Sequence, residues 1–141
     1  MTDVTARLFR PLLLCLALAA SGCATQAANS VTLAPEISAQ IEVLNADLHS
    51  EAELTGGEAL YEDKILSGYA IIQSHADEKL ILEGRWTFED NQGYPMPSAN
   101  RAWKTIYLNA REEQKVQGRA SAPMAMRAKY ELRYRLVENE D

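Results

Sequence analysis

The sequence predicts an all-β protein: a single immunoglobulin-like antiparallel β-sandwich that follows a signal peptide and a short flexible tether. Two segments alternate apolar and polar residues with period two, which is typical of strands with one buried face. Turn-forming residues separate these segments from several weaker apolar runs, as expected for short antiparallel strands. The 141 residues, of which 47% are hydrophobic, suffice for one domain with its own core.

The first 22 residues have the three parts of an export signal. Arg7 and Arg10 make the start basic, an apolar run extends from Leu12 to Ala20, and small residues follow it. A membrane-spanning helix needs about 20 apolar residues, and this run is much shorter. It therefore indicates a lipoprotein signal peptide over residues 1–22 rather than a permanent membrane anchor.

The stretch Ala20-Ser21-Gly22-Cys23 resembles a bacterial lipobox. This resemblance implies that Cys23 carries a lipid such as palmitate. Ala24, where Asp would favour the inner membrane, implies the periplasmic face of the outer membrane of a Gram-negative cell. Ordinary secretion, with cleavage after Ala17-Leu18-Ala19, is the alternative. Cys15 leaves with the signal in either case, so the mature chain has a single cysteine and no internal disulfide.

Residues 24–34 are small or polar and carry no charge, and Pro35 follows them. We therefore expect residues 23–35 to comprise the lipidated cysteine and a flexible tether. Eleven residues of flexible chain have a root-mean-square reach of roughly 20 Å. The β-sandwich domain is expected to extend from residue 36 to residue 141.

The clearest strand signals lie in residues 79–89 and 128–136. The residues predicted to face the core are Leu80, Leu82, Gly84, Trp86 and Phe88 in the first strand, and Ala128, Tyr130, Leu132, Tyr134 and Leu136 in the second. Weaker runs at 41–44, 65–73, 103–109 and 114–120 predict further strands. Residues 47–63 contain Glu, Ala and Leu but are interrupted by Gly56-Gly57, so we expect a loop with a helical turn there.

The formal charge of -6 argues against a nucleic-acid partner, which requires an excess of Lys and Arg. Charge is also uneven along the chain, because the segment 36–63 contains eight acidic residues and no Lys or Arg. This acidic segment is either a solvated surface or a cover for the basic outer face of the last strand.

Residues 65–136 resemble the YcfL-like family of periplasmic lipoproteins. The resemblance rests on the strand and turn from Arg85 to Gly93, on Trp103, on Ser121-Ala122-Pro123 and on the closing alternating strand. It implies a cell-envelope protein without an established biochemical activity, and a partner in cell-wall assembly. Independently of the family, Asp90 can cap the turn with its side chain and Gly93 can adopt a positive φ, as a hairpin requires.

The sequence contains no catalytic or metal-binding motif that we can recognise. His49 and His75 do not have metal-ligand spacing with another His, Cys or Asp, and no Gly-x-Ser-x-Gly elbow or phosphate-binding loop occurs. We therefore expect no enzyme activity, no cofactor and no metal.

The remaining candidates are surface residues. Tyr94, Arg101 and Trp103 lie in an apolar and aromatic loop between two strands, where binding residues often occur. The alternative is that Tyr94 and Trp103 close one end of the core. Arg133 and Arg135, with Arg127 and Lys129, form either a basic strip for an anionic partner or the protection of an edge strand.

These observations predict a non-enzymatic binding or scaffold lipoprotein of the cell envelope. Its contact with the membrane would be the lipid on Cys23, its partner an envelope protein or peptidoglycan, and its domain monomeric. The alternative is a small carbohydrate- or peptidoglycan-binding module that uses Trp103 and Tyr94 as stacking platforms.

Overall fold

The structure is a computed structural model that describes residues 27–97 and 101–136. The signal peptide, Cys23 and the first part of the expected tether lie outside the described residues. Within these two ranges, no helix has the length and apolar character that crossing a membrane requires.

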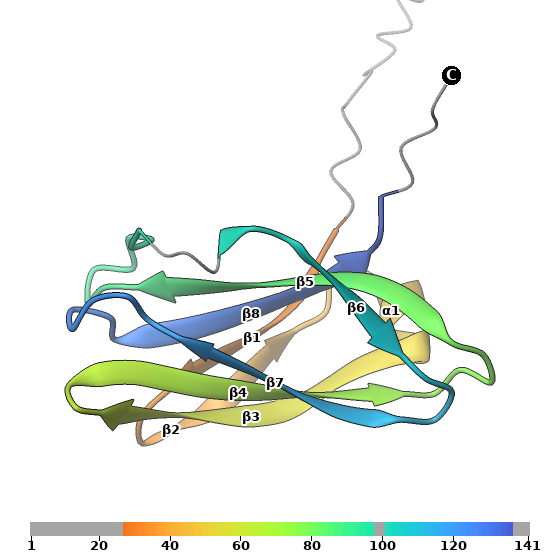
Figure 1. Ribbon diagram of the computed structural model, residues 1–141, viewed down its shortest axis with the longest axis horizontal. Helices are drawn as coiled ribbons and strands as arrows, with labels where there is room; N and C mark the ends of the chain where they lie inside the picture. The colour runs from red at the N-terminus through yellow and green to blue at the C-terminus, as the bar shows by residue number, and fades with distance from the viewer. Residues whose placement is uncertain (1–26, 98–100, 137–141) are drawn as a thin grey trace, which may run out of the picture.

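The described part of the chain forms eight strands and one short helix. In chain order they are β1 (Asn29–Ala34), β2 (Ile37–Glu42), α1 (Ala46–Glu51), β3 (Ala52–Glu62), β4 (Ile65–Ser74), β5 (Leu80–Glu89), β6 (Lys104–Leu108), β7 (Glu113–Arg119) and β8 (Arg127–Tyr134). Sheet A has the strand order β2-β1-β8-β5-β6, and sheet B has the order β3-β4-β7. The two antiparallel sheets pack face to face (Figure 1), which confirms the predicted all-β sandwich.

The sandwich has two ends with different contents. At one end lie the start of β1, the end of β8, helix α1, and the β4–β5 and β6–β7 connections (Figure 1). We call this the α1 end. The β1–β2, β3–β4, β5–β6 and β7–β8 connections lie at the other end, which we call the loop end. Both chain exits from the described sandwich are therefore at the α1 end.

The core between the sheets centres on Trp86, which is 5% exposed. Its ring lies against sheet B where Gly68 of β4 pairs with Gly118 of β7. A Cβ on Gly118 would stand 2.6 Å from the ring and one on Gly68 3.4 Å from it, so the two glycines leave the space that the indole occupies. Tyr130 packs on the same ring with centroids 5.0 Å apart, and burial raises the pKa of its hydroxyl far above the usual value.

The inward faces predicted for the two clearest strands are confirmed. Leu82, Trp86 and Phe88 of β5 and Ala128, Tyr130 and Leu132 of β8 are all buried. Leu136 lies beyond the end of β8 instead of continuing its inner face, and it is 46% exposed.

The tether predicted for residues 23–35 is wrong from Asn29 onward. Residues 29–34 form β1, which lies inside sheet A between β2 and β8 and buries Val31 and Leu33. The lack of charge that suggested a tether is equally typical of a strand whose neighbours on both sides leave little surface to water. The domain therefore starts at Asn29 rather than at residue 36.

The loop predicted for residues 47–63 is also wrong, although its helical turn exists as α1. Residues 52–62 form β3, an edge strand that pairs with β4 along its whole length. A register shift between Leu54 and Gly56 marks a β-bulge, and both Gly56 and Gly57 have φ near 152°. The glycines therefore reshape a strand rather than end one.

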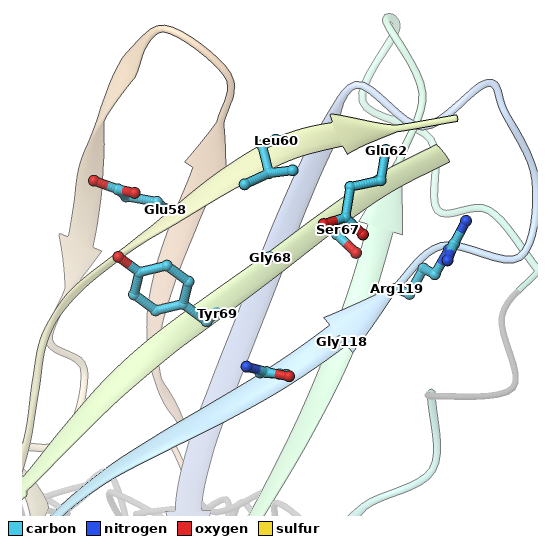
Figure 2. A pocket seen from close by; sticks show the side chains of 9 residues that line it. Glu58, Leu60, Glu62, Ser67, Gly68, Tyr69, Gly118 and Arg119 are labelled. Atoms are coloured by element: carbon cyan, nitrogen blue, oxygen red, sulfur yellow. The ribbon is translucent and has the colours of Figure 1, made fainter. Parts of the chain in front are cut away.

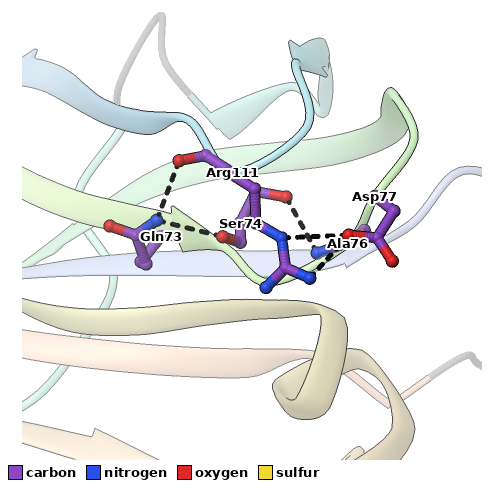
Figure 3. A network of polar contacts seen from close by, with 5 residues as sticks. All are labelled: Gln73, Ser74, Ala76, Asp77 and Arg111. Carbon is purple, nitrogen blue, oxygen red and sulfur yellow. Dashed lines mark hydrogen bonds and ion pairs between the residues drawn. The ribbon is translucent and has the colours of Figure 1, made fainter.

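Polar contacts join the two connections that cross between the sheets at the α1 end (Figure 3). Arg111, with a φ of 59°, donates to Oδ1 of Asp77 from Nε at 3.1 Å and from Nη2 at 2.6 Å. Its backbone N–H donates to the carbonyl of Ala76, and its own carbonyl accepts from the amide of Gln73. The β4–β5 and β6–β7 connections are thus held to each other.

Candidate functional site

The solvent face of sheet A carries two ion pairs between its central strands. The β5–β8 register places Glu83 opposite Arg133 and Arg85 opposite Glu131. Arg133 binds Glu83 at 2.9 Å, and Arg85 binds Glu131 at 2.5 Å. The side chains of Arg133, Glu83 and Glu131 are only 16%, 17% and 17% exposed. Four charges therefore form two ion pairs; the pair of Arg133 and Glu83 is largely buried, whereas Arg85 in the other pair is 34% exposed.

Trp103 covers these ion pairs. It lies one residue before Lys104, the first residue of β6, which pairs with Gly84 next to Arg85 on β5. The guanidinium carbon of Arg133 lies 3.8 Å from the centroid of the indole, and that of Arg85 lies 4.4 Å from it. Both distances are within the range of a cation–π interaction. The indole is therefore held in place by two side chains that are themselves ion-paired.

A groove of about 430 Å³ opens beside this ring on the outer face of sheet A. Its lining residues are Ala27, Ala28, Ser30, Glu42, Leu44, Arg85, Trp103, Lys129, Glu131 and Arg133. We call it the Trp103 groove. It combines a fixed aromatic ring with charged and hydroxyl groups, and these are the components of a binding site that orders few side chains when it is occupied.

The structure brings together two of the five residues predicted to bind a partner. Trp103 and Arg133 meet at the groove, whereas Tyr94 lies at the loop end and is 64% exposed. Pro95, next to Tyr94, pairs with Glu89, four residues along β5 from Arg85, which corresponds to about 13 Å. Trp103 and Tyr94 therefore do not form one platform, and neither closes an end of the core.

The other two predicted residues, Arg101 and Arg135, are both exposed. Arg101 is near Trp103 in sequence and Arg135 follows the end of β8, but neither lines the Trp103 groove.

The basic residues of β8 do not protect an edge strand, and the basic strip predicted for an anionic partner stays a prediction. β8 lies between β1 and β5, so its charges do not protect an edge. Arg127 faces Glu89 at 3.7 Å and Arg133 binds Glu83, so acids of β5 already accompany them. The sequence could not show this pairing, because period two predicts which residues share a face and not which strand lies alongside.

The acidic segment 36–63 does not cover the outer face of β8. Its longest element, β3, lies in the opposite sheet, where Glu53 contacts His75 at 2.8 Å, and β1 separates its β2 from β8 in sheet A. At the α1 end, Glu51 accepts a hydrogen bond from the hydroxyl of Tyr134, and burial together with this contact raises the pKa of Tyr134 to about 12. Glu42 is the one acid of the segment that lines the Trp103 groove.

The turn predicted at residues 90–93 is confirmed. Oδ1 of Asp90 accepts from the backbone N–H groups of Gln92 and Tyr94 at 2.9 and 3.0 Å, and Gly93 has a φ of 81°. These contacts make the segment a structural turn after β5.

A second groove, which sequence reasoning missed, lies on the outer face of sheet B (Figure 2). It measures about 480 Å³, and its lining residues are Glu58, Leu60, Glu62, Ser67, Gly68, Tyr69, Gln117, Gly118 and Arg119. The ammonium group of Lys115 lies 3.7 Å from the centroid of the Tyr69 ring. Burial, followed by the charge and hydrogen bond of Glu58, raises the pKa of Tyr69. The alternation of residues 65–73 would have placed Tyr69 on a wet face.

Within residues 27–97 and 101–136, no group of three or more His, Cys, Asp or Glu side chains could hold a metal ion. The side chains that line the two grooves offer hydrogen-bonding groups, charges and aromatic faces.

The geometry defines a small two-sheet β-sandwich protein with an aromatic groove on each outer face. The chain belongs to the DUF1425 family, described as "Protein of unknown function", whose family model matches residues 29–134. The match begins at the first residue of β1 and ends at the last residue of β8, which agrees with the corrected start of the domain.

Two solved structures have similar folds. A crystal structure of a DUF1425 family member from Shewanella sp. pv-4 is 19% identical, with a TM-score of 0.58, over 70% of this chain and 91% of that chain. The crystal structure of Campylobacter jejuni cj0090 is 13% identical, with a TM-score of 0.51, over 58% of this chain and 85% of that one. At these identities the likeness concerns the fold alone. No curated protein matches the chain.

Proposed function

We propose that the protein is a non-enzymatic binding or scaffold lipoprotein of the Gram-negative cell envelope, anchored through Cys23 to the periplasmic face of the outer membrane. The lipobox-like stretch and the resemblance to YcfL-like periplasmic lipoproteins support the location. The partner is an envelope protein, and the Trp103 groove is the surface that contacts it.

The observation that carries the binding function is the fixed position of Trp103. Its ring rests on Arg85 and Arg133, whose charges are already taken by Glu131 and Glu83. A partner would therefore meet an ordered aromatic and lose little entropy in ordering it. Tryptophan and arginine are also the residues that most often dominate the free energy of a protein interface.

A second candidate function is the binding of peptidoglycan glycan, and the sheet B groove favours it. One aromatic ring, Tyr69, lies there among polar side chains that can donate or accept hydrogen bonds, including Glu58 and Ser67 (Figure 2). Gln117 also lines the groove. An aromatic face with surrounding polar groups is the combination that a sugar ring requires.

One experiment on the membrane-anchored protein compares the two candidates. Wild type, Trp103→Ala and Tyr69→Ala are each assayed for cross-linked capture of envelope proteins and for co-sedimentation with purified peptidoglycan. Tyr107→Ala is the control, because Tyr107 is an exposed aromatic of sheet A with Lys79 over its ring, outside the Trp103 groove. We expect Trp103→Ala alone to lower protein capture, by about tenfold or more if Trp103 is a hot spot.

Equal capture by Trp103→Ala and wild type would remove the Trp103 groove from consideration. Sedimentation that is lost in Tyr69→Ala and retained in Trp103→Ala would favour the glycan function instead. Unchanged behaviour of all three variants in both assays would contradict both candidate surfaces.

A further inference from the structure

The attachment point of the proposed anchor lies close to the described domain. From the Cα atom of Cys23 to that of Ala27 there are four residue steps, and an extended chain covers at most about 14 Å in that distance. β5 has ten residues and therefore measures about 33 Å from the α1 end to the loop end. A lipid on Cys23 would thus keep the α1 end near the bilayer and cannot bring the loop end equally close.

Exposed apolar side chains surround the place where the chain enters β1. On one side, β2 pairs with β1 through Glu42 and Ser30, and Val43 and Leu44 follow β2 directly. Val43 is 42% exposed and Leu44 is 62% exposed. On the other side, β8 pairs with β1 and continues into the exposed Leu136.

The exposure of Leu44 is a fixed feature of the fold. The side-chain amide of Asn29, itself 2% exposed, accepts hydrogen bonds from the backbone N–H groups of Leu44 and Asn45 at 2.9 and 2.8 Å. It also donates to the carbonyl of Asn45 at 2.9 Å, and the Asn45 side chain in turn caps α1. A buried asparagine therefore fixes the segment that presents Leu44 to the surroundings.

We propose that the α1 end rests on the bilayer in the anchored protein, with Val43, Leu44 and Leu136 in the headgroup region. Leu44 also lines the Trp103 groove, so the groove would then open beside the membrane surface. The inference rests on the proposed lipid anchor at Cys23, which supplies the reason why a lipid surface, rather than another protein, covers these side chains. Moving leucine and valine side chains from water into the interfacial region of a bilayer lowers the free energy.

Charge around these residues favours zwitterionic lipid. Arg135 lies next to Leu136, whereas Glu42 and Asp47 flank Val43 and Leu44 on the other side. The sequence after Leu136 adds three further acids, Glu138, Glu140 and Asp141. The contact with the bilayer is therefore expected to come from the apolar side chains and not from attraction to anionic headgroups.

The test places a polarity-sensitive fluorophore on a single introduced cysteine of the lipidated protein in phosphatidylethanolamine vesicles with a minor share of phosphatidylglycerol. Lipidated Cys23 carries no free thiol, so Leu44→Cys and Met124→Cys give single labels. Met124 is the matched control, because it is 69% exposed and lies in the β7–β8 connection at the loop end. Circular dichroism verifies that both labelled variants are folded.

We expect the Leu44 label to emit at shorter wavelength in vesicles than in detergent-free buffer, and the Met124 label to emit as in water in both. The same shift in vesicles without phosphatidylglycerol would support the apolar origin of the contact. A vesicle-bound protein whose Leu44 label emits as in water would overturn the proposed orientation while leaving the lipid anchor intact. A shift of both labels in vesicles would overturn the proposed orientation in favour of a different one. A shift of the Leu44 label in the absence of vesicles would also overturn the proposal, because protein and not lipid would then cover Leu44.

If the proposed lipid anchor at Cys23 does not exist, the experiment gives a result that differs from those for a wrong orientation. Unlabelled wild type that does not float with vesicles would contradict lipidation at Cys23, and the orientation would fall with it. The Cys23→Ser protein carrying the Leu44 label separates the two contributions, because it should remain soluble and show no shift at the same vesicle concentration.

Discussion

The two tryptophans of the domain occupy opposite sides of sheet A and are held by opposite kinds of neighbours. Trp86 points into the core, where Gly68, Gly118 and Tyr130 shape its pocket. Trp103 lies on the outer face, where Arg85 and Arg133 support its ring. The Trp86 ring fits into space that two glycines of sheet B leave open, whereas the Trp103 ring is supported by two arginine side chains.

This difference implies that one tryptophan of sheet A stabilises the fold and the other is free to bind a partner. Removing an indole from the core leaves a cavity whose walls cannot collapse without moving two strands. An indole on an outer face can be removed without opening the core, because water replaces it. The comparison therefore predicts that Trp86 contributes much more than Trp103 to the stability of the fold. It also predicts that Trp103 contributes much more than Trp86 to the binding of a partner.

The largest expected effect is that of Trp86→Ala. We expect the free energy of unfolding to fall by about 3–5 kcal/mol, which is a large part of the total for a domain of this size. Urea unfolding of the mature Cys23→Ser protein, followed by far-UV circular dichroism, measures this change. An unfolding midpoint close to that of the parent protein would show that Trp86 is not the centre of the core.

Gly118→Ala tests the glycine side of the same pocket. The added Cβ would stand 2.6 Å from the Trp86 ring, so we expect a loss of about 1–3 kcal/mol from overpacking. Gly68→Ala is the matched control, because its Cβ would be 3.4 Å from the same ring and should cost less. In the Trp86→Ala background the cost of Gly118→Ala should largely disappear, and additive losses in this double-mutant cycle would refute the proposed role of the glycine.

The sequence predicted Trp86 well and Trp103 only in part, for a physical reason. Alternation within β5 is sufficient to place Trp86 on the inner face, because a strand with one buried face has period two. Alternation in and just before β6 places Trp103 on the face opposite Ile106 and Leu108, both of which are buried. The sequence therefore contained the information that Trp103 faces outward. It did not contain the position of the ring over Arg85 and Arg133, since that position depends on β5 lying between β6 and β8.

The errors in the N-terminal third have a related cause. β1 is short and uncharged, and β3 alternates poorly because its bulge moves later residues to the opposite face. Burial of β1 comes from β2, which follows it directly, and from β8, which lies far after it in the chain, so local composition could not distinguish β1 from a tether. The predicted signal peptide and Cys23 lie outside the described residues and stay predictions.

The smallest effect, and the sharpest test of the comparison, is that of Trp103→Ala on stability. Each exposed cation–π contact contributes about 0.5–1 kcal/mol, so loss of the contacts with Arg85 and Arg133 should lower the free energy of unfolding by about 1–2 kcal/mol. Urea unfolding of the Cys23→Ser protein measures this, with Tyr107→Ala, which loses one such contact with Lys79, as the reference for a smaller change. The ion pairs beneath the ring should become more accessible to water, so the stability of Trp103→Ala should depend more on salt than that of the parent. If Trp103→Ala instead costs as much as Trp86→Ala, the ring is a structural part of sheet A, and any loss of partner capture in that variant would reflect unfolding rather than recognition.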